Sequence, residues 1–152
     1  MEVHFYQLWS SPLPRVIYDL STRCLDHGWR VNIVAPKQVA AIDTALWTFD
    51  DMVFFPHGTE SDDRASEQTV VLSDEPTQVN QAQALILAGM ADISSKTVAG
   101  FERVCVIFSG QNPDELGNAR TGWKQITGDG HIAKYWSQES GAWDLKASSD
   151  GG

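Results

Sequence analysis

The sequence predicts an α/β protein with a three-layer α/β/α arrangement, in which the central layer is a mostly parallel sheet. Two observations lead to this prediction. The first third of the chain alternates between β-branched or aromatic runs and segments with helical spacing, in the order strand, helix, strand, helix. Further on, RVCVIFSG at 103–110 is an almost continuous apolar run. Such a run is typical of a strand that is buried on both faces inside a parallel sheet.

Four elements are expected in the first third. The short aromatic-rich segment VHFYQL at 3–8 predicts a strand. Apolar residues at helical spacing predict a helix over 15–27, with Gly28 at the position of a C-cap glycine. The β-branched run RVNIVAP at 30–36 predicts a second strand, and the alanine-rich segment at 37–47 predicts a second helix. This order is the signature of parallel strands joined by helices.

The middle of the chain mixes acidic loops with short buried strands. Residues 58–67 are rich in acidic side chains and lack the apolar ones that could offset the cost of ordering them, so we expect a solvated loop there. TVVLS at 69–73 and ALILAG at 84–89 predict buried strands. KTVAGFE at 96–102 predicts a short helix before the strand at 103–110.

A longer helix is expected directly after that strand. Asn112 is a good N-cap, and Pro113 suits the first helical position. Asp114 and Glu115 complement the positive end of the helix dipole, and the glycines at 128 and 130 end the helix.

The C-terminal part predicts one more strand. IAKYWSQ at 132–138 is interpreted as a final edge strand. A length of 152 residues suggests one domain. We assign it to residues 1–146 and expect residues 147–152 to form a disordered tail.

Composition narrows the classes of function. The hydrophobic content of 42% and charged content of 20% are ordinary for a globular protein, and the net charge is -9. Such a chain repels the phosphate backbone, so we expect no tight direct binding of DNA. The N-terminus lacks a basic start followed by an apolar run, and no window approaches the roughly 20 apolar residues that span a membrane. The sequence therefore predicts a cytoplasmic protein without a membrane partner.

Motifs for catalysis and for cofactor binding are missing. Cys24 and Cys105 form neither a C-x-x-C pair nor a zinc spacing, so we interpret them as buried thiols. The four histidines show no metal-ligand spacing, and no dinucleotide fingerprint, phosphate-binding loop or nucleophile elbow is present. We expect no catalytic residue, no metal and no cofactor. The alternative is a small α/β nucleotide-binding protein or enzyme, with a site at the carboxyl ends of its strands that these motifs do not recognise.

Two groups of aromatic residues are candidates for binding. The first comprises Trp47, Phe49, Phe54, Phe55 and Pro56, spread over a helix end and an irregular segment. Aromatic residues on such segments are easier to expose than those on strands, and an exposed patch of them indicates a protein partner.

The second group contains Arg120, Trp123 and Lys124, which helical spacing brings within one turn of one another. Two interpretations are open. The cations could form a solvated basic face with Trp123 packed inward. Alternatively, the three side chains could form a receptor for an acidic peptide, in which the cations hold carboxylates and the indole holds an aromatic C-terminal residue.

Several segments together show a resemblance to a known family. They are ALWTFDDMVFFPHG, ALILAG, FERVCVIFSG, ARTGWKQ and YWSQESGAW, in this order and spacing. The sequence resembles the chi subunit of bacterial DNA polymerase III over nearly its whole length. The resemblance implies a three-layer α/β/α domain without catalytic activity. Chi-like proteins are accessory subunits of the clamp-loader assembly, and they bind the acidic C-terminal tail of the single-stranded-DNA-binding protein, which ends in Pro-Phe.

The resemblance also assigns site residues. The family's tail-binding arginine, aromatic residue and lysine correspond to Arg120, Trp123 and Lys124, and Phe108 is implied to line the same pocket. The resemblance also implies a second binding surface. There, Trp47 and Phe54 are implied to bind psi, the small second subunit, or a helicase partner.

Two departures from the family pattern concern the helix that carries the triad. Gly117 and Gly122 weaken it by up to about 1 kcal/mol each relative to alanine. Gln125, Ile126 and Thr127 stand where further basic residues often follow in the family. A weaker affinity for the tail is therefore expected.

Overall fold

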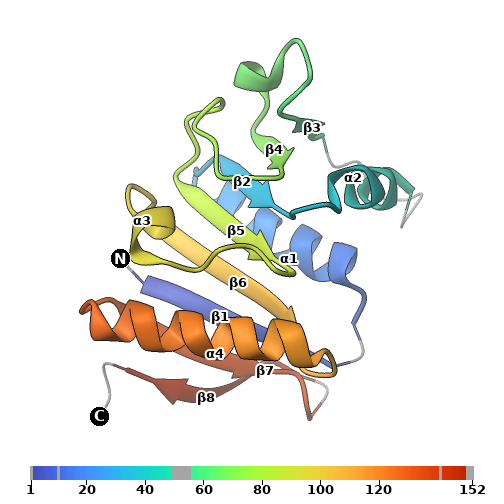
Figure 1. The fold of residues 1–152 in the computed structure, drawn as a ribbon. Coiled ribbons are helices and arrows are strands. Elements are labelled where there is room, and N and C mark those ends of the chain that lie inside the picture. The colour runs from blue at the N-terminus through green and yellow to red at the C-terminus, as the bar shows by residue number, and fades with distance from the viewer. Residues whose placement is uncertain (1, 10, 49–55, 141, 150–152) are drawn as a thin grey trace.

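A computed structural model describes residues 2–9, 11–48, 56–140 and 142–149. In this part of the chain, eight strands form one sheet with helices on both faces (Figure 1). The strand order is β3-β4-β2-β5-β6-β1-β7-β8, and every neighbouring pair is parallel except β7 with β8. The predicted α/β class with a mostly parallel sheet is confirmed.

The elements follow one another closely along the chain. The strands are β1 (Glu2–Leu8), β2 (Val31–Val34), β3 (Gly58–Thr59), β4 (Val70–Ser73), β5 (Ala84–Ala88), β6 (Arg103–Ser109), β7 (Ile132–Ser137) and β8 (Asp144–Ser148). The helices are α1 (Leu13–Asp26), α2 (Val39–Thr48), α3 (Ser95–Val98) and α4 (Pro113–Gly128), with a 3-10 turn η1 (Ala65–Glu67). The four elements predicted for the first third are all present, and Gly28 adopts the left-handed φ of 83° that a glycine after a helix favours.

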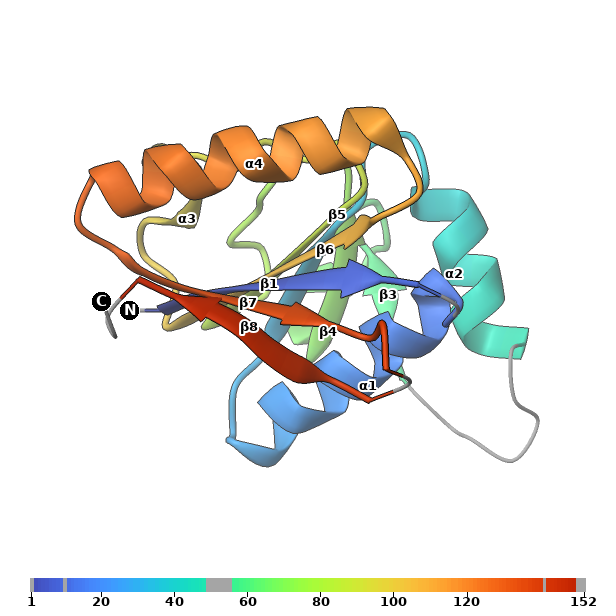
Figure 2. The same cartoon turned by 90° about the horizontal axis from the view of Figure 1, so that it is seen from below.

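Helices lie on both faces of the sheet (Figure 2). Connections between parallel strands are right-handed. A connection that leads to a strand nearer the β3 edge of the sheet therefore lies on one face, and a connection that leads to a strand nearer the β8 edge lies on the other. Helices α1 and α2 belong to the first kind, and α3 and α4 belong to the second. The sheet therefore separates two apolar cores, one under α1 and α2 and one under α4.

The central strands supply side chains to both cores by simple alternation. In β1, Val3 and Phe5 pack in the core under α4, whereas Tyr6 and Leu8 pack in the core under α1. Strand β6 is buried over its five central residues, as its apolar run predicts. The helices thus cover the two faces of strands that are apolar on both sides.

Helix α4 begins as its sequence predicts. The Asn112 side-chain oxygen accepts hydrogen bonds from the backbone N–H groups of Asp114, at 3.0 Å, and Glu115, at 3.2 Å. The Glu115 carboxylate in turn accepts from the backbone N–H of Ser109 at 3.1 Å and from the Asn112 amide at 2.9 Å. These bonds satisfy donors that the first helical turn would otherwise leave unpaired, and they fix α4 to the end of β6.

The expected edge strand is wrong in position. Strand β7 lies inside the sheet between β1 and β8, and the edge is β8, which pairs with β7 in antiparallel fashion. The sequence DLKAS of β8 shows little alternation, and its large apolar residue, Leu145, is exposed, so the pattern gives no signal of a strand. Strand β8 also runs to residue 148, beyond the boundary expected at 146.

Two connections differ from the predicted ones. The acidic segment 58–67 is largely exposed, but it also contains strand β3 and the turn η1, where Ala65 is buried. Helix α3 covers only four residues and ends before Gly100, because the φ of 88° at Gly100 is incompatible with a right-handed helix.

The connection from β4 to β5, residues 74–83, contains no helix and passes over β2 on the face of α3 and α4 (Figure 1).

Candidate functional site

A cavity of about 420 Å³ opens between α4 and the strands beneath it, and we call it the cationic cavity. Helix α4 contributes Leu116, Ala119, Arg120, Trp123 and Lys124. These positions follow the spacing of one helical stripe, so a single face of α4 forms this wall. The strands contribute Phe5, Gln7, Phe108 and Tyr135. The structure therefore places Arg120, Trp123, Lys124 and Phe108, which the sequence singled out, around one cavity.

Aromatic rings form the inner wall of the cationic cavity. Trp123 is half-buried and meets Phe5 edge to face, with ring centroids 5.4 Å apart. Phe108 is buried, and its ring centroid lies 6.1 Å from that of Tyr135. Trp123 thus packs against the core under α4 and also lines the cavity.

The two cations of the cavity are exposed. In the part of the chain that the structure describes, no carboxylate lies within ion-pair distance of the Arg120 or Lys124 side chain, and no side-chain hydrogen bond holds either one. Burial raises the pKa of Tyr135, although the nearby positive charge of Arg120 opposes that rise. The Tyr135 hydroxyl therefore stays protonated and can donate a hydrogen bond beside two cations. This set of donors next to apolar rings suits a carboxylate that is attached to an apolar group.

A glycine explains how closely α4 approaches its neighbour. A Cβ atom on Gly122 would lie 2.5 Å from Cγ2 and 2.6 Å from Cβ of Ile93, which real contacts do not allow. The Asn118 amide also donates to the backbone carbonyl of Ala91 at 3.0 Å. Gly122, which the sequence suggested was a weakness, permits α4 to pack against residues 91–93. Gly117 has open space beside it, so its cost to the helix has no such compensation.

Three strand residues of the cavity were not identified from the sequence: Phe5, Gln7 and Tyr135. The alternation of side chains between the two faces of a strand is the signal that could have identified them. In β1 and β7, alternate residues face α4, and the register pairs Phe5 with Tyr135 across the two strands. Without the strand order, however, nothing in the sequence shows that these strands lie side by side.

Trp47, the described residue of the second predicted surface, lies away from the cationic cavity. Trp47, in the last turn of α2, is 48% exposed, and its ring stacks on His57 with centroids 4.3 Å apart. Phe54, which the sequence assigned to the same surface, lies outside the described residues, as do Phe49 and Phe55. Helix α2 packs on the face of α1, so the sheet stands between Trp47 and the cationic cavity.

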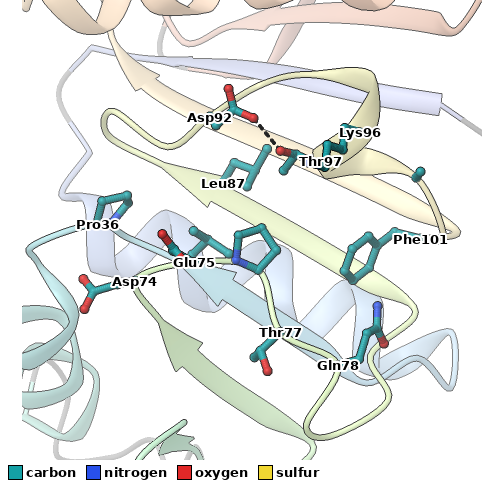
Figure 3. A pocket seen from close by; sticks show the side chains of 13 residues that line it. Pro36, Asp74, Glu75, Thr77, Gln78, Leu87, Asp92, Lys96, Thr97 and Phe101 are labelled. Carbon is teal, nitrogen blue, oxygen red and sulfur yellow. Dashed lines mark hydrogen bonds between the residues drawn. The ribbon is translucent and has the colours of Figure 1, made fainter.

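A larger cavity of about 680 Å³ lies on the same face of the sheet as α4, between the β4–β5 connection and α3 (Figure 3). Three acidic residues and one lysine line it, so we call it the acidic cavity. None of the site residues predicted from the sequence belongs to this lining.

Other titratable groups lie away from both cavities. Cys24 and Cys105 are buried free thiols that share a hydrogen bond, and this bond, with burial, raises the pKa of Cys105. Burial lowers the pKa of His4 on the α1 face of the sheet. Within residues 2–9, 11–48, 56–140 and 142–149, no group of three or more His, Cys, Asp or Glu could hold a metal ion. No helix in those ranges is sufficiently long and apolar to cross a bilayer.

Comparison with known proteins gives two findings. The sequence profile of the family described as "DNA polymerase III chi subunit, HolC" matches residues 1–134. A protein of Rickettsia prowazekii (strain Madrid E), described as "Probable DNA polymerase III subunit chi", is 27% identical over 100 residues. That alignment covers 61% of this chain and 61% of the relative, so the chain matches less than two thirds of the relative's length.

Proposed function

Because this chain belongs to the DNA polymerase III chi subunit family, we propose that it is a non-catalytic accessory subunit of the bacterial replicase. In this role it associates with the clamp loader and supports DNA replication. Its cationic cavity binds the acidic C-terminal tail of the single-stranded-DNA-binding protein.

One observation carries this proposal. Arg120 and Lys124, both exposed, stand on either side of Trp123 in sequence and line an aromatic-walled cavity with it. A tail that ends in Pro-Phe would place its ring against the aromatic wall and its terminal carboxylate beside the cations. Charge-assisted hydrogen bonds to carboxylates are stronger than neutral ones, and a buried aromatic ring adds a large apolar contact.

Because the chain as a whole is acidic, an acidic peptide can bind only where cations are concentrated. The net charge of -9 repels an acidic peptide from most of the surface. Tail binding therefore depends on the few cations at the cavity, and it weakens as salt rises because charges near the surface are screened.

The test is a fluorescence titration of the purified protein with a labelled peptide of the tail's last residues, ending in Pro-Phe. Replacing the terminal phenylalanine of the peptide by alanine should weaken binding by about 10- to 100-fold, since a buried aromatic ring contributes roughly 1.5–3 kcal/mol. Arg120→Ala and Lys124→Ala should each weaken it by about 2- to 10-fold, because the two cations are exposed.

Arg23→Ala is the matched control, because it removes one exposed cation from α1 on the opposite face of the sheet. The proposal fails if the tail peptide does not bind, or if Arg23→Ala weakens binding as much as Arg120→Ala does.

We further propose that Trp47 belongs to a separate interface with psi or a helicase partner. Its 48% exposure at the end of α2 supports this role, because large aromatic residues so exposed on a surface are typical of protein interfaces. In the same titration, Trp47→Ala should leave binding of the tail peptide unchanged, while it should weaken capture of a purified psi subunit. Loss of tail binding in this variant would contradict the separation of the two surfaces.

A further inference from the structure

The acidic cavity exists because one connection lacks a helix. Between β4 and β5 the chain must cross β2 on the face of α3 and α4, where a helix would normally cover the strands. Residues 74–83 cross as an irregular segment instead, and α3 beside them has only four residues. A space of about 680 Å³ is left between the two segments (Figure 3).

Apolar side chains form the base of the acidic cavity and part of its lining nearer the surface. Val34 and Leu87 form its base and are almost fully buried, and Phe101 closes one end. Pro36 and Pro76 line it nearer the surface, and Pro76 is exposed. An aliphatic chain could therefore lie along this space in contact with carbon atoms on several sides.

The charges at this cavity are mostly negative, and they differ in their hydrogen bonding. Asp74 accepts a hydrogen bond from the backbone N–H of Lys37 at 2.8 Å, and Asp92 accepts one from the Thr97 hydroxyl (Figure 3). These two carboxylates thus have structural partners. Among the residues that the structure describes, no donor or cation lies within bonding distance of the Glu75 carboxylate, which belongs to the exposed segment after β4.

We propose that the acidic cavity is a docking site for a basic segment of a partner protein, in which an arginine or lysine is flanked by apolar residues. The methylene groups of the basic side chain lie along the prolines and Phe101, as the stems of long cationic side chains commonly lie on apolar surface. Its charged head meets Glu75, with Asp92 across the cavity adding to the negative potential. This site is independent of the function proposed for the cationic cavity.

Charge complementarity selects this occupant. The lining carries Asp74, Glu75 and Asp92 against the single cation Lys96. An acidic peptide or a nucleic acid would therefore meet net repulsion here, in addition to that of the whole chain. Lys96 also competes with the basic segment, so its removal should favour docking.

The experiment is an NMR titration of the ¹⁵N-labelled full chain. The probe is a blocked pentapeptide of leucine, arginine, proline, arginine and leucine, and the control peptide has glutamates in place of the arginines. The basic peptide should shift amide signals of residues 74–78 and 92–101, and it should bind at least about 10-fold more tightly than the acidic peptide, since that ratio needs only ~1.4 kcal/mol.

Variants locate the interaction. Glu75→Lys should weaken binding of the basic peptide by about 5-fold or more, because it replaces attraction by repulsion at this position. Lys96→Gln should strengthen it by about 2- to 5-fold for the opposite reason. Glu60→Lys makes the same change of charge in the exposed segment next to β3, away from the lining, and should change binding by less than about 2-fold.

Three results would overturn the proposal. One is the absence of shifts in residues 74–78 and 92–101 at millimolar basic peptide. Another is equal binding of the basic and acidic peptides. The third is an equal loss of binding in Glu75→Lys and Glu60→Lys, which would show a general effect of net charge rather than a site.

Discussion

The cationic and acidic cavities lie on the same face of one sheet, yet they carry opposite charge and are built in different ways. A regular helix covers the first and contributes a stripe that includes Arg120 and Lys124. An irregular connection covers the second and contributes Asp74 and Glu75. The difference shows that local placement of side chains, rather than the net charge of -9, decides the sign of the charge at a cavity.

The two cavities also differ in how they are tied to the core. The cationic cavity uses Phe108, a buried residue in the apolar core strand β6. The acidic cavity uses Phe101, which precedes that strand and is slightly less buried. We therefore expect the first cavity to be the more rigid of the two, and the following predictions test that contrast.

The largest effect is expected from truncating these two rings. Phe108→Ala should lower the free energy of unfolding by about 3–5 kcal/mol, because it removes a buried aromatic side chain and leaves a void in the core. Phe101→Ala should cost less, since the adjacent segment can move into the space. Urea unfolding of both variants measures the difference. Equal losses of stability would contradict the expectation that the cationic cavity is the more rigid of the two.

A smaller effect is expected where α4 meets the segment that separates the two cavities. Gly122→Ala should lower the free energy of unfolding by about 1–3 kcal/mol, because its Cβ would overlap Ile93, a branched and buried side chain. Gly117→Ala is the matched control in the same helix and should raise stability by up to about 1 kcal/mol, since alanine favours the helix and nothing lies nearby. Thermal unfolding of both variants should give shifts of opposite sign. A gain in Gly122→Ala would show that α4 does not depend on this close approach.

The smallest effect on stability is expected from lowering the pH, which protonates His4 on the face of the sheet opposite to both cavities. His4 Nδ1 accepts a hydrogen bond from the Trp136 indole at 3.1 Å, and Nε2 lies 3.1 Å from a Glu2 carboxylate oxygen. The neutral ring fits both bonds when Nε2 carries the proton. Burial lowers the pKa of His4 below its ordinary value of 6.5, so the unfolded chain binds a proton more readily than the folded one.

This difference in proton binding sets the sign of the pH effect. The contribution of His4 to stability is complete above its unfolded pKa of 6.5 and is lost as the pH falls below it toward the folded pKa. Urea unfolding between about pH 7.5 and pH 5.5 should show stability falling with acid, and His4→Gln should reduce that slope. Because His4 packs on the α1 face, the binding proposed for the cationic and acidic cavities should keep its preference for charge. An unchanged slope in His4→Gln would contradict the role of this residue.

Local patterns in the sequence predict most of the elements. The apolar run of β6, the helical spacing of α1 and the capping residues before α4 each specify one element through short-range physics. The stripe of Arg120, Trp123 and Lys124 follows from the same reasoning, because positions three and four apart share a helix face. Strand β8 was not predicted, because an exposed edge strand forms without an alternating apolar pattern.

The sequence by itself therefore determined the fold class, the helix that carries two cations beside an indole, and the acidic character of the chain. Only the tertiary structure decided what surrounds that helix, because the pairing of β1 with β6 and β7 brings Phe5, Phe108 and Tyr135 together from distant parts of the chain. It also decided the role of Gly122 and the existence of the acidic cavity. Both depend on which segments lie side by side, and contacts between distant residues leave no periodic signal in the sequence.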